Sequence, residues 1–233
     1  MNAQNSLKLT GIGSMATRLV MTALASAWER KSGHEISLIS IGGVDVQKRI
    51  RAGEAFDFVV LAAKVIDAQA DEGHAEPQRF DIARSEMMVA VRSGMAHPAI
   101  GSEAALREAI AAGGRIGYST GPSGDYLVGL LKGWGMTDAL ASRLVQAPPG
   151  IGVAQLLAEN KADLGFQQMS EFVGEAGIEV IGPLPEPLRL VTTFSAAVCV
   201  KANQAEAARE FLAFAVSPEA DAIKAECGMT PAR

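Results

Sequence analysis

The chain has 233 residues, enough for one large domain or two small ones with a substantial buried core. Hydrophobic residues make up 48% of the chain and charged residues 20%, the composition of an ordinary globular protein. The 26 acidic and 21 basic residues give a formal charge of -5, so the chain lacks the general positive field that nucleic-acid binding requires. Nucleic acid is therefore excluded as a partner, and any anion must be recognised locally.

Cysteine, histidine and apolar patterning exclude several other classes. Cys199 and Cys227 are predicted to be buried thiols, and the three histidines are far apart in sequence with no zinc-ligand spacing, so neither a metal nor a cofactor is expected. No apolar run approaches the roughly 20 residues that span a bilayer, so the protein is not expected to be membrane-embedded. The first six residues lack the regions of a secretory signal. We therefore expect a periplasmic protein if a removed signal peptide preceded this sequence, and a cytoplasmic one if Met1 is the native start.

Strand-like and helix-like segments alternate along the first part of the chain, which predicts an α/β fold with helices packed on mostly parallel sheets. Ser14 is expected to cap the first helix, Gly33 to end it, and Asp45 to cap the second helix. The carboxyl end of the third strand, at Ala62 and Ala63, should lie beside the first two strand ends. The predicted elements here are strands at 7–9, 36–41 and 56–62, a helix at 15–31 and a short helix after residue 45.

The same alternation continues to the C-terminus. Ser102 and Gly113 are expected to bound a helix, and the prolines of residues 182–187 indicate a connector because proline cannot donate to a central strand ladder. The predicted elements are strands at 86–91, 115–119, 163–168 and 178–181, one or two strands within 188–200, and helices at 103–112, 125–134, 151–159, 205–216 and 219–227.

Three predicted strands end in short glycine-rich loops, at residues 11–15, 42–45 and 120–124. In open α/β sheets ligands bind beyond the carboxyl ends of the strands, and the N–H groups at a following helix start attract anions without needing a lysine. Any one of these loops, taken alone, is explained as a tight turn. Three of them at strand ends predict a binding cleft.

Several side chains near these loops could contact a ligand. Arg18 lies one turn into the first helix and could grip a carboxylate bidentately, although a solvated arginine is the commoner outcome. The hydroxyls of Ser14, Thr120 and Ser123 suit anions but would be occupied if they cap helices. Arg84 and Ser85 could close on a ligand or form a surface ion pair, and Tyr126, Gln167 and Gln168 could orient a ligand or simply pack. The predicted ligand-binding residues are Gly13, Ser14, Met15, Arg18, Gly43, Val44, Ala62, Arg84, Ser85, Thr120, Ser123, Gly124, Tyr126, Gln167 and Gln168.

With these loops in place, the whole chain resembles the type II periplasmic binding proteins, and in particular the molybdate-binding family of transport proteins. The resemblance rests on the Gly13-Ser14 turn, on residues 50–62 (IRAGEAFDFVVLA), on residues 119–126 and on residues 162–171 (ADLGFQQMSE). It implies two lobes joined by two hinge strands, at 86–91 and 196–200, with an anion bound between the lobes. Lobe 1 would hold residues 1–87 and 194–233, and lobe 2 residues 88–193. A monomer that serves a membrane ABC transporter is expected.

One position departs from the family pattern. Molybdate binders usually offer a serine or threonine hydroxyl at the second loop, where this chain has Gly42, Gly43 and Val44. Losing that donor weakens the case for molybdate or tungstate, which stays an alternative, while Arg18 and Arg84 would suit a carboxylate better. The sequence therefore favours a small organic di- or tricarboxylate as the ligand.

Two further functions compete with simple binding. Some proteins that resemble this family, aconitate isomerase among them, move a proton on a bound polycarboxylate, and the missing secretion signal favours that activity. Proton transfer needs a base, however, and the loops contain no histidine or cysteine, with Asp45 and Asp125 the nearest ionisable groups. A solute-binding protein is therefore predicted ahead of an isomerase, and a ligand sensor with a protein partner is the third alternative.

Overall fold

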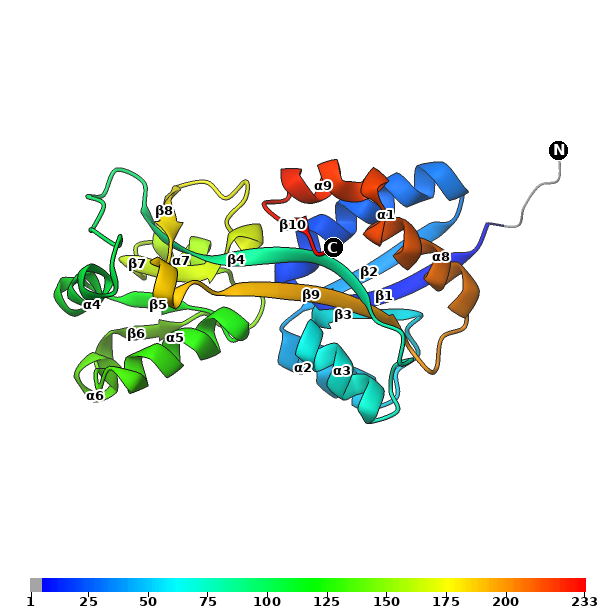
Figure 1. Ribbon diagram of the computed structural model, residues 1–233, viewed down its shortest axis with the longest axis horizontal. Helices are drawn as coiled ribbons and strands as arrows, with labels where there is room; N and C mark the ends of the chain where they lie inside the picture. Colours follow the sequence, from blue (N-terminus) through cyan, green and yellow to red (C-terminus); the bar gives the residue numbers. More distant parts are fainter. Residues whose placement is uncertain (1–5) are drawn as a thin grey trace. The chain divides into compact units, whose positions relative to one another are not determined.

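The computed structural model describes residues 6–233, which fold into two compact units (Figure 1). Unit 1 contains the chain up to Arg84 and again from Thr193 to Arg233, and unit 2 is Ser85–Thr192. Strands β4 (Phe80–Arg92) and β9 (Val191–Val198) carry the chain from one unit to the other. The sequence predicts these divisions after residues 87 and 193, whereas the units divide after Arg84 and Thr192. The predicted hinge segments, 86–91 and 196–200, likewise begin after those two points.

Unit 1 is a sheet with the strand order β2-β1-β3-β9, covered by helices on both faces. β1 pairs in parallel with β2 and β3, while β9 is antiparallel to β3 and β10 is antiparallel to β4. Helices α2 and α3 pack on one face and α1 and α8 on the other (Figure 1). The elements not yet bounded are β1 (Lys8–Ser14), η1 (Met15–Thr17), α1 (Arg18–Ser32), β2 (Glu35–Ile41), α2 (Gly43–Arg51), β3 (Phe58–Ala62), α3 (Ala63–Asp71), α8 (Ala205–Val216), η5 (Pro218–Ala220), α9 (Asp221–Glu226) and β10 (Thr230–Pro231).

The larger core of unit 1 is built around Phe58 of β3, whose ring lies 5.2 Å from that of Phe211 on α8. Gly11 makes room for this ring, because a Cβ at that position would lie 2.2 Å from Cζ of Phe58. The glycine that looks like part of a loop is therefore needed for packing inside β1. Cys199 and Cys227 are both free and buried, as predicted.

Unit 2 has the strand order β4-β7-β5-β6, with β8 also paired to β4. β5 is parallel to β6 and β7, and β4 is antiparallel to β7 and β8. The remaining elements are α4 (Glu103–Ala112), β5 (Ile116–Tyr118), α5 (Pro122–Gly133), α6 (Thr137–Leu140), η2 (Ala141–Arg143), β6 (Leu144–Gln146), α7 (Val153–Ala158), β7 (Leu164–Gln168), η3 (Met169–Glu171), β8 (Ile178–Pro183) and η4 (Glu186–Leu188).

The predicted α/β class is confirmed, and the antiparallel pairs in both sheets come from the two strands that cross between units and from short strands paired with them. Ser102 accepts a hydrogen bond from the Ala105 amide at 3.1 Å, and Gly33 ends α1 at φ 75°, both as expected. Helix α3 was not predicted, because it follows an apolar strand without a polar or glycine cap. Among residues 6–233, no helix is long and apolar enough to cross a bilayer.

Candidate functional site

Three strand ends of unit 1 meet at one edge of its sheet, which we call the unit 1 edge (residues 14–18, 42–45 and 62–64). The parallel register pairs Ser14 with Ile41 and Gly13 with Val60, so β1, β2 and β3 all end at this edge. Each strand passes directly into a helical segment: η1 and then α1, α2, and α3. The edge therefore gathers three helix N-termini, whose N–H groups and dipoles favour a negative charge.

Ser14 lies at this edge, at the end of β1. Its Oγ is buried and has no hydrogen-bond partner within the part of the chain that the structure describes. The expectation that Ser14 caps the first helix is wrong, because the chain enters that helix through the tight turn η1 and the Ser14 side chain makes no capping bond. Instead Thr17 Oγ1 donates to the Ser14 carbonyl at 2.9 Å. A buried hydroxyl without a partner is costly, so Ser14 is suited to a partner that the protein itself does not supply.

The backbone of the edge is shaped by glycine. A Cβ at Gly13 would lie 3.0 Å from Thr17 Oγ1 and 3.2 Å from the Val60 carbonyl oxygen, so a side chain there would crowd the turn. The N-cap of α2 is Gly42, so the prediction that Asp45 caps this helix is wrong. The Asp45 carboxylate binds Lys48 Nζ at 3.0 Å instead. Val44, between Gly43 and Asp45 in the first turn of α2, is 52% exposed and has no hydroxyl to offer.

The charges at the unit 1 edge are mostly positive. Arg18 is the first residue of α1 and is exposed, and its side chain makes no hydrogen bond or ion pair with the described residues. Lys64, the second residue of α3, is exposed and unpaired within the same described range. No acidic residue lies in the first turn of either helix. Sequence reasoning missed Lys64 because it missed α3; a lysine directly after the apolar strand at 58–62 was the available signal.

The corresponding unit 2 edge is formed by the carboxyl ends of β5, β6 and β7, where Tyr118 pairs with Gln146 and with Phe166. Helix α5 begins at Pro122, earlier than predicted, because proline suits the first helical position. Its cap is Gly121, so neither Thr120 nor Ser123 caps the helix: Thr120 is exposed, and Ser123 Oγ lies 3.1 Å from Ser119 Oγ. The turn at residues 119–124 thus packs closely against the first turn of α5.

Gly124 is required by that loop, because a Cβ there would lie 1.7 Å from the Ser119 carbonyl oxygen. Ser85 Oγ accepts a hydrogen bond from the Ser170 amide at 3.2 Å, and Ser85 is buried. Arg84 belongs to unit 1, where its guanidinium donates to the Ala232 carbonyl at 3.1 Å and so ties β4 to the C-terminal segment.

Gln167, Gln168 and Tyr126, all predicted to contact the ligand, differ in how many of their polar atoms are already hydrogen-bonded within the protein. Gln167 is buried and satisfied, since Oε1 accepts from the Val153 amide at 2.8 Å and Nε2 donates to Glu171 at 2.7 Å. Gln168 donates to Thr192 Oγ1 at 2.9 Å, but its buried Oε1 has no partner in the described chain. Tyr126 packs against the unit 2 core and donates to the Leu188 carbonyl at 3.2 Å, which indicates a structural role.

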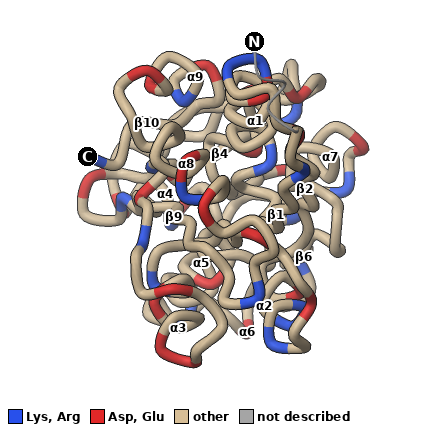
Figure 2. Tube along the Cα trace, turned by 90° about the vertical axis from the view of Figure 1, so that its right-hand side faces the viewer, with Lys and Arg blue, Asp and Glu red and all other residues tan. Residues whose placement is uncertain are grey.

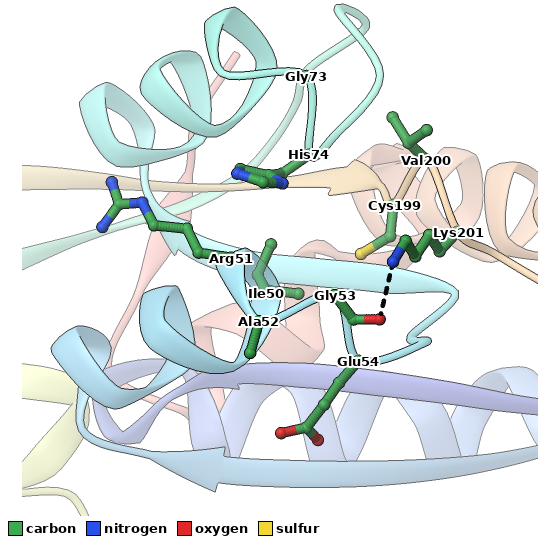
Figure 3. Close-up of a pocket in the computed structure, with 10 residues that line it drawn as sticks. All are labelled: Ile50, Arg51, Ala52, Gly53, Glu54, Gly73, His74, Cys199, Val200 and Lys201. Carbon is green, nitrogen blue, oxygen red and sulfur yellow. Dashed lines mark hydrogen bonds between the residues drawn. The ribbon is translucent and has the colours of Figure 1, made fainter.

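A separate open pocket of about 180 Å³ lies in unit 1 at the opposite end of β3 (Figure 3). Cys199 lines it, and burial together with the charge of Asp57 raises the pKa of this thiol to about 12, so it is a poor nucleophile. Lys201 Nζ donates to the Gly53 carbonyl at 3.2 Å, at the end of α2, and Arg51 is held by Glu72 through bonds of 2.7 and 2.8 Å. The basic groups at this pocket bind a helix C-terminus or form an ion pair. Along the whole chain, basic and acidic residues are interspersed (Figure 2).

The residues at both edges fit no metal centre. Among the described residues, no group of three or more histidine, cysteine, aspartate or glutamate side chains is placed to hold a metal ion. The donors that the two edges offer are backbone amides, hydroxyls and amide side chains, together with the two basic side chains of unit 1. This is the chemistry of small-solute recognition.

Two α/β units joined by two strands, with helix N-termini at their strand ends, define the class of type II periplasmic solute-binding proteins. The chain matches the family of bacterial extracellular solute-binding proteins over residues 9–230 and belongs to that family. The resemblance predicted from the sequence is thus confirmed.

Individual relatives differ in what they are named for. The chain is 27% identical over 235 residues to an aconitate isomerase of a Pseudomonas species, covering 98% of this chain and 90% of that protein. The periplasmic molybdate-binding protein of Azotobacter vinelandii has a similar fold, with a TM-score of 0.80 at 20% identity over 97% of this chain and 100% of that one. The sulfate-binding protein of Mycobacterium tuberculosis follows with a TM-score of 0.76 at 14% identity, over 97% and 87%.

Proposed function

We propose that this chain binds a small organic di- or tricarboxylate as a solute-binding protein, with the unit 1 edge supplying the contacts to the anion. The observation that carries the proposal is the buried Ser14 hydroxyl, which has no hydrogen-bond partner among residues 6–233, at an edge where three helix N-termini meet. Arg18 adds a charge that suits a carboxylate. Gly13, Met15, Gly43, Val44 and Ala62 contribute backbone at the same edge.

The second loop argues for a carboxylate over a tetrahedral oxyanion. A tetrahedral anion with oxygens on all sides is best held by several neutral donors, and Gly43 and Val44 replace the hydroxyl that molybdate binders usually offer there. A carboxylate presents two oxygens in one plane, which an arginine fork matches. Because proteins of similar fold bind molybdate and sulfate, a metal oxyanion or sulfate is the alternative ligand for this chain.

The affinity needed is modest. Hydrogen bonds to charged groups contribute about 1.5–3 kcal/mol each, and micromolar binding needs about 8 kcal/mol net. Association itself costs on the order of 4–15 kcal/mol. Reaching this affinity therefore takes several such bonds, and we propose that the Ser14 hydroxyl, the Arg18 guanidinium and the N–H groups of the unit 1 edge supply them together.

Isomerisation of the bound polycarboxylate is the second candidate, and the similarity to an aconitate isomerase favours it. Against it stands the chemistry of the unit 1 edge, where Asp45 is the one carboxylate and is already paired with Lys48. Incubation with either aconitate isomer, followed by NMR, tests this directly. Formation of the other isomer would establish an isomerase, and no conversion at high protein concentration would leave binding as the function.

Calorimetry against citrate, tricarballylate, succinate, molybdate and sulfate tests the ligand class. Ser14→Ala should weaken carboxylate binding about tenfold or more, while the free protein becomes no less stable because a buried unsatisfied hydroxyl is removed. Ser93→Ala is the matched control, since Ser93 is exposed and makes no side-chain hydrogen bond to described residues. Stabilisation by molybdate or sulfate alone, or unchanged affinity in Ser14→Ala, would contradict the proposal.

The cellular role follows from the family as part of this proposal. An exported solute-binding protein would work in the periplasm as a monomer and deliver its ligand to a membrane transporter. Uptake of the identified carboxylate by cells lacking this chain tests the role: unchanged uptake would favour an enzyme or a sensor instead.

A further inference from the structure

Thr17 closes the turn that carries Ser14. Its Oγ1 donates to the Ser14 carbonyl at 2.9 Å, and the residue is 1% exposed. A threonine forms this bond, to the carbonyl three residues earlier, readily within a helical turn. Thr17 is the last residue of η1, directly before α1, so the bond lies where the chain leaves β1. Because Thr17 is buried, any effect that it has on a ligand passes through its neighbours.

Ser14 has the backbone of a capping residue without the side-chain bond. Its φ of -73° and ψ of 158° are the extended values of an N-cap, yet within the described chain its hydroxyl makes no capping hydrogen bond. A capping serine accepts from an amide two or three residues further on, and the third amide after Ser14 is that of Thr17. The Ser14 Oγ is instead buried with no partner among residues 6–233. Two uses therefore compete for this hydroxyl: a cap on the following helix, and a contact to a ligand.

The hydrogen bonds of the turn differ from those of a capped helix. In an α-helix capped by Ser14, the Ser14 carbonyl would accept from the Arg18 amide, four residues further on. Here the Arg18 amide bonds to the Met15 carbonyl instead. The Thr17 hydroxyl takes the place of that amide at the Ser14 carbonyl. A Cβ at Gly13 would lie 3.0 Å from Thr17 Oγ1, so this arrangement also depends on the glycine. Thr17 therefore stabilises the tight turn against the capped helix.

We infer that Thr17 is a positioning residue, which holds the turn in its tight form and so keeps the Ser14 hydroxyl off its own helix and available to the ligand. This inference rests on the proposed anion binding at the unit 1 edge and adds the residue that determines the state of Ser14 there. Thr17 itself does not touch the ligand. Without the Thr17 hydroxyl, the Ser14 carbonyl takes the Arg18 amide and Ser14 caps the helix. The free protein then gains a cap while the ligand loses a donor.

The free protein tests whether Thr17 controls Ser14. Thr17→Val keeps the branched shape, but a methyl group cannot stay 2.9 Å from the carbonyl oxygen, because such contacts are about 3.3–3.6 Å long. In the wild-type background, Ser14→Ala should leave the melting temperature unchanged or higher, because an unpartnered buried hydroxyl is lost. In the Thr17→Val background, Ser14→Ala should lower it by about 2–4 °C, because the serine there is a cap. Thr22→Val, at an exposed threonine of α1, is the matched control and should leave the effect of Ser14→Ala as in wild type.

Calorimetry of the full chain with citrate, succinate, molybdate and sulfate tests the effect on binding. Thr17→Val should weaken binding of the anion that the wild type takes by about tenfold or more, because the Ser14 donor is withdrawn. Thr17→Ser keeps the donor to the Ser14 carbonyl and should restore binding to within about threefold of wild type. The double variant Ser14→Ala/Thr17→Val should bind no more weakly than Ser14→Ala alone, because Thr17 acts through Ser14. A merely structural role would add the cost of Thr17→Val to that of Ser14→Ala.

The outcomes separate this inference from the proposed function. If Ser14→Ala changes the melting temperature equally in the wild-type and Thr17→Val backgrounds, Thr17 does not keep the hydroxyl off the helix and the inference is wrong. If Thr17→Val binds as tightly as the wild type, or if the two changes weaken binding additively, the inference is also wrong, while anion binding stands. Binding of molybdate or sulfate alone would overturn the proposed carboxylate but still test Thr17 with that anion. Failure of the wild type to bind any of the four overturns both proposals.

Discussion

Asp57 is a buried carboxylate whose loss should destabilise unit 1. It is 2% exposed and accepts three hydrogen bonds: from the Thr10 amide at 2.7 Å, from Thr10 Oγ1 at 3.0 Å, and from the Gln204 amide at 2.8 Å. These bonds join β1 and the start of β3 to Gln204, which caps α8. The carboxylate therefore ties together segments that are 147 residues apart in sequence.

The cost of Asp57→Asn can be worked from these contacts. The amide group has one acceptor oxygen and one donor NH2, so the Thr10 side or the Gln204 side must lose its acceptor whichever way it turns. An unsatisfied buried N–H costs about 1–3 kcal/mol, and weakening two charge-assisted bonds to neutral ones costs about 1 kcal/mol each. We expect the free energy of unfolding of unit 1 to fall by about 3–5 kcal/mol.

Urea unfolding followed by fluorescence measures this change in unit 1. Trp28 belongs to the unit 1 core, with its ring 5.4 Å from that of Phe214, whereas Trp134 belongs to unit 2. A Trp134→Phe background therefore reports unit 1 alone. Asp71→Asn is the matched control, because Asp71 is exposed and its neutralisation should change stability by no more than about 0.5 kcal/mol.

A different result would refute the reasoning. If Asp57→Asn and Asp71→Asn unfold at the same urea concentration, the three hydrogen bonds contribute nothing net. Hydrogen exchange gives an independent reading, since the Thr10 and Gln204 amides should lose protection in Asp57→Asn. Unchanged protection of both amides would show that they do not depend on the carboxylate.

Three further predictions follow from single positions. Cys199, with its pKa raised to about 12 by burial and the charge of Asp57, should resist thiol reagents at pH 8 until the protein is unfolded; rapid native labelling would contradict its burial. Gly53→Ala should destabilise by about 1–2 kcal/mol because Gly53 has φ 81°, whereas Gly129→Ala, in open space within α5, should stabilise by about 0.5–1 kcal/mol. The Arg115 guanidinium holds the pKa of Asp163 below its usual range, so this carboxylate stabilises the fold above about pH 4 and loses that effect as the pH falls through its folded pKa. Asp163→Asn should flatten the acid limb of the stability curve, and an NMR titration showing an ordinary Asp163 pKa would overturn this assignment.

The sequence predicts most of the fold because its signals are local and strong. The helix at 205–216 is predicted with the bounds that the structure has, and Ser102 caps its helix as the side-chain chemistry indicates. The start of the first helix could not be predicted, because the choice between a side-chain cap at Ser14 and a tight turn depends on Thr17 and on the crowded β1–β3 contact. That contact is between segments far apart in sequence.

For the candidate site, the sequence predicts which strand ends come together, but not the hydrogen bonds of each side chain there. The glycine-rich strand ends identify the two edges, since parallel strands bring their carboxyl ends together. The hydrogen bonding of each side chain was not predictable: Gln167 is already bonded to Val153 and Glu171, while Oε1 of neighbouring Gln168 has no partner among the described residues. Such differences depend on which loop packs over which residue, and the sequence pattern contains no distance information across the sheet.

The order of synthesis gives the division of the chain a further consequence. Unit 2 is one continuous stretch, so it can complete its fold while the ribosome is still adding the last 41 residues, Thr193–Arg233. Unit 1 must wait, because β9 pairs with β3 and Phe211 fills the core around Phe58 only after those residues emerge. Until then Phe58 lacks Phe211 and the Asp57 carboxylate lacks the Gln204 amide, and the first half of unit 1 is the stretch that a chaperone would have most reason to hold.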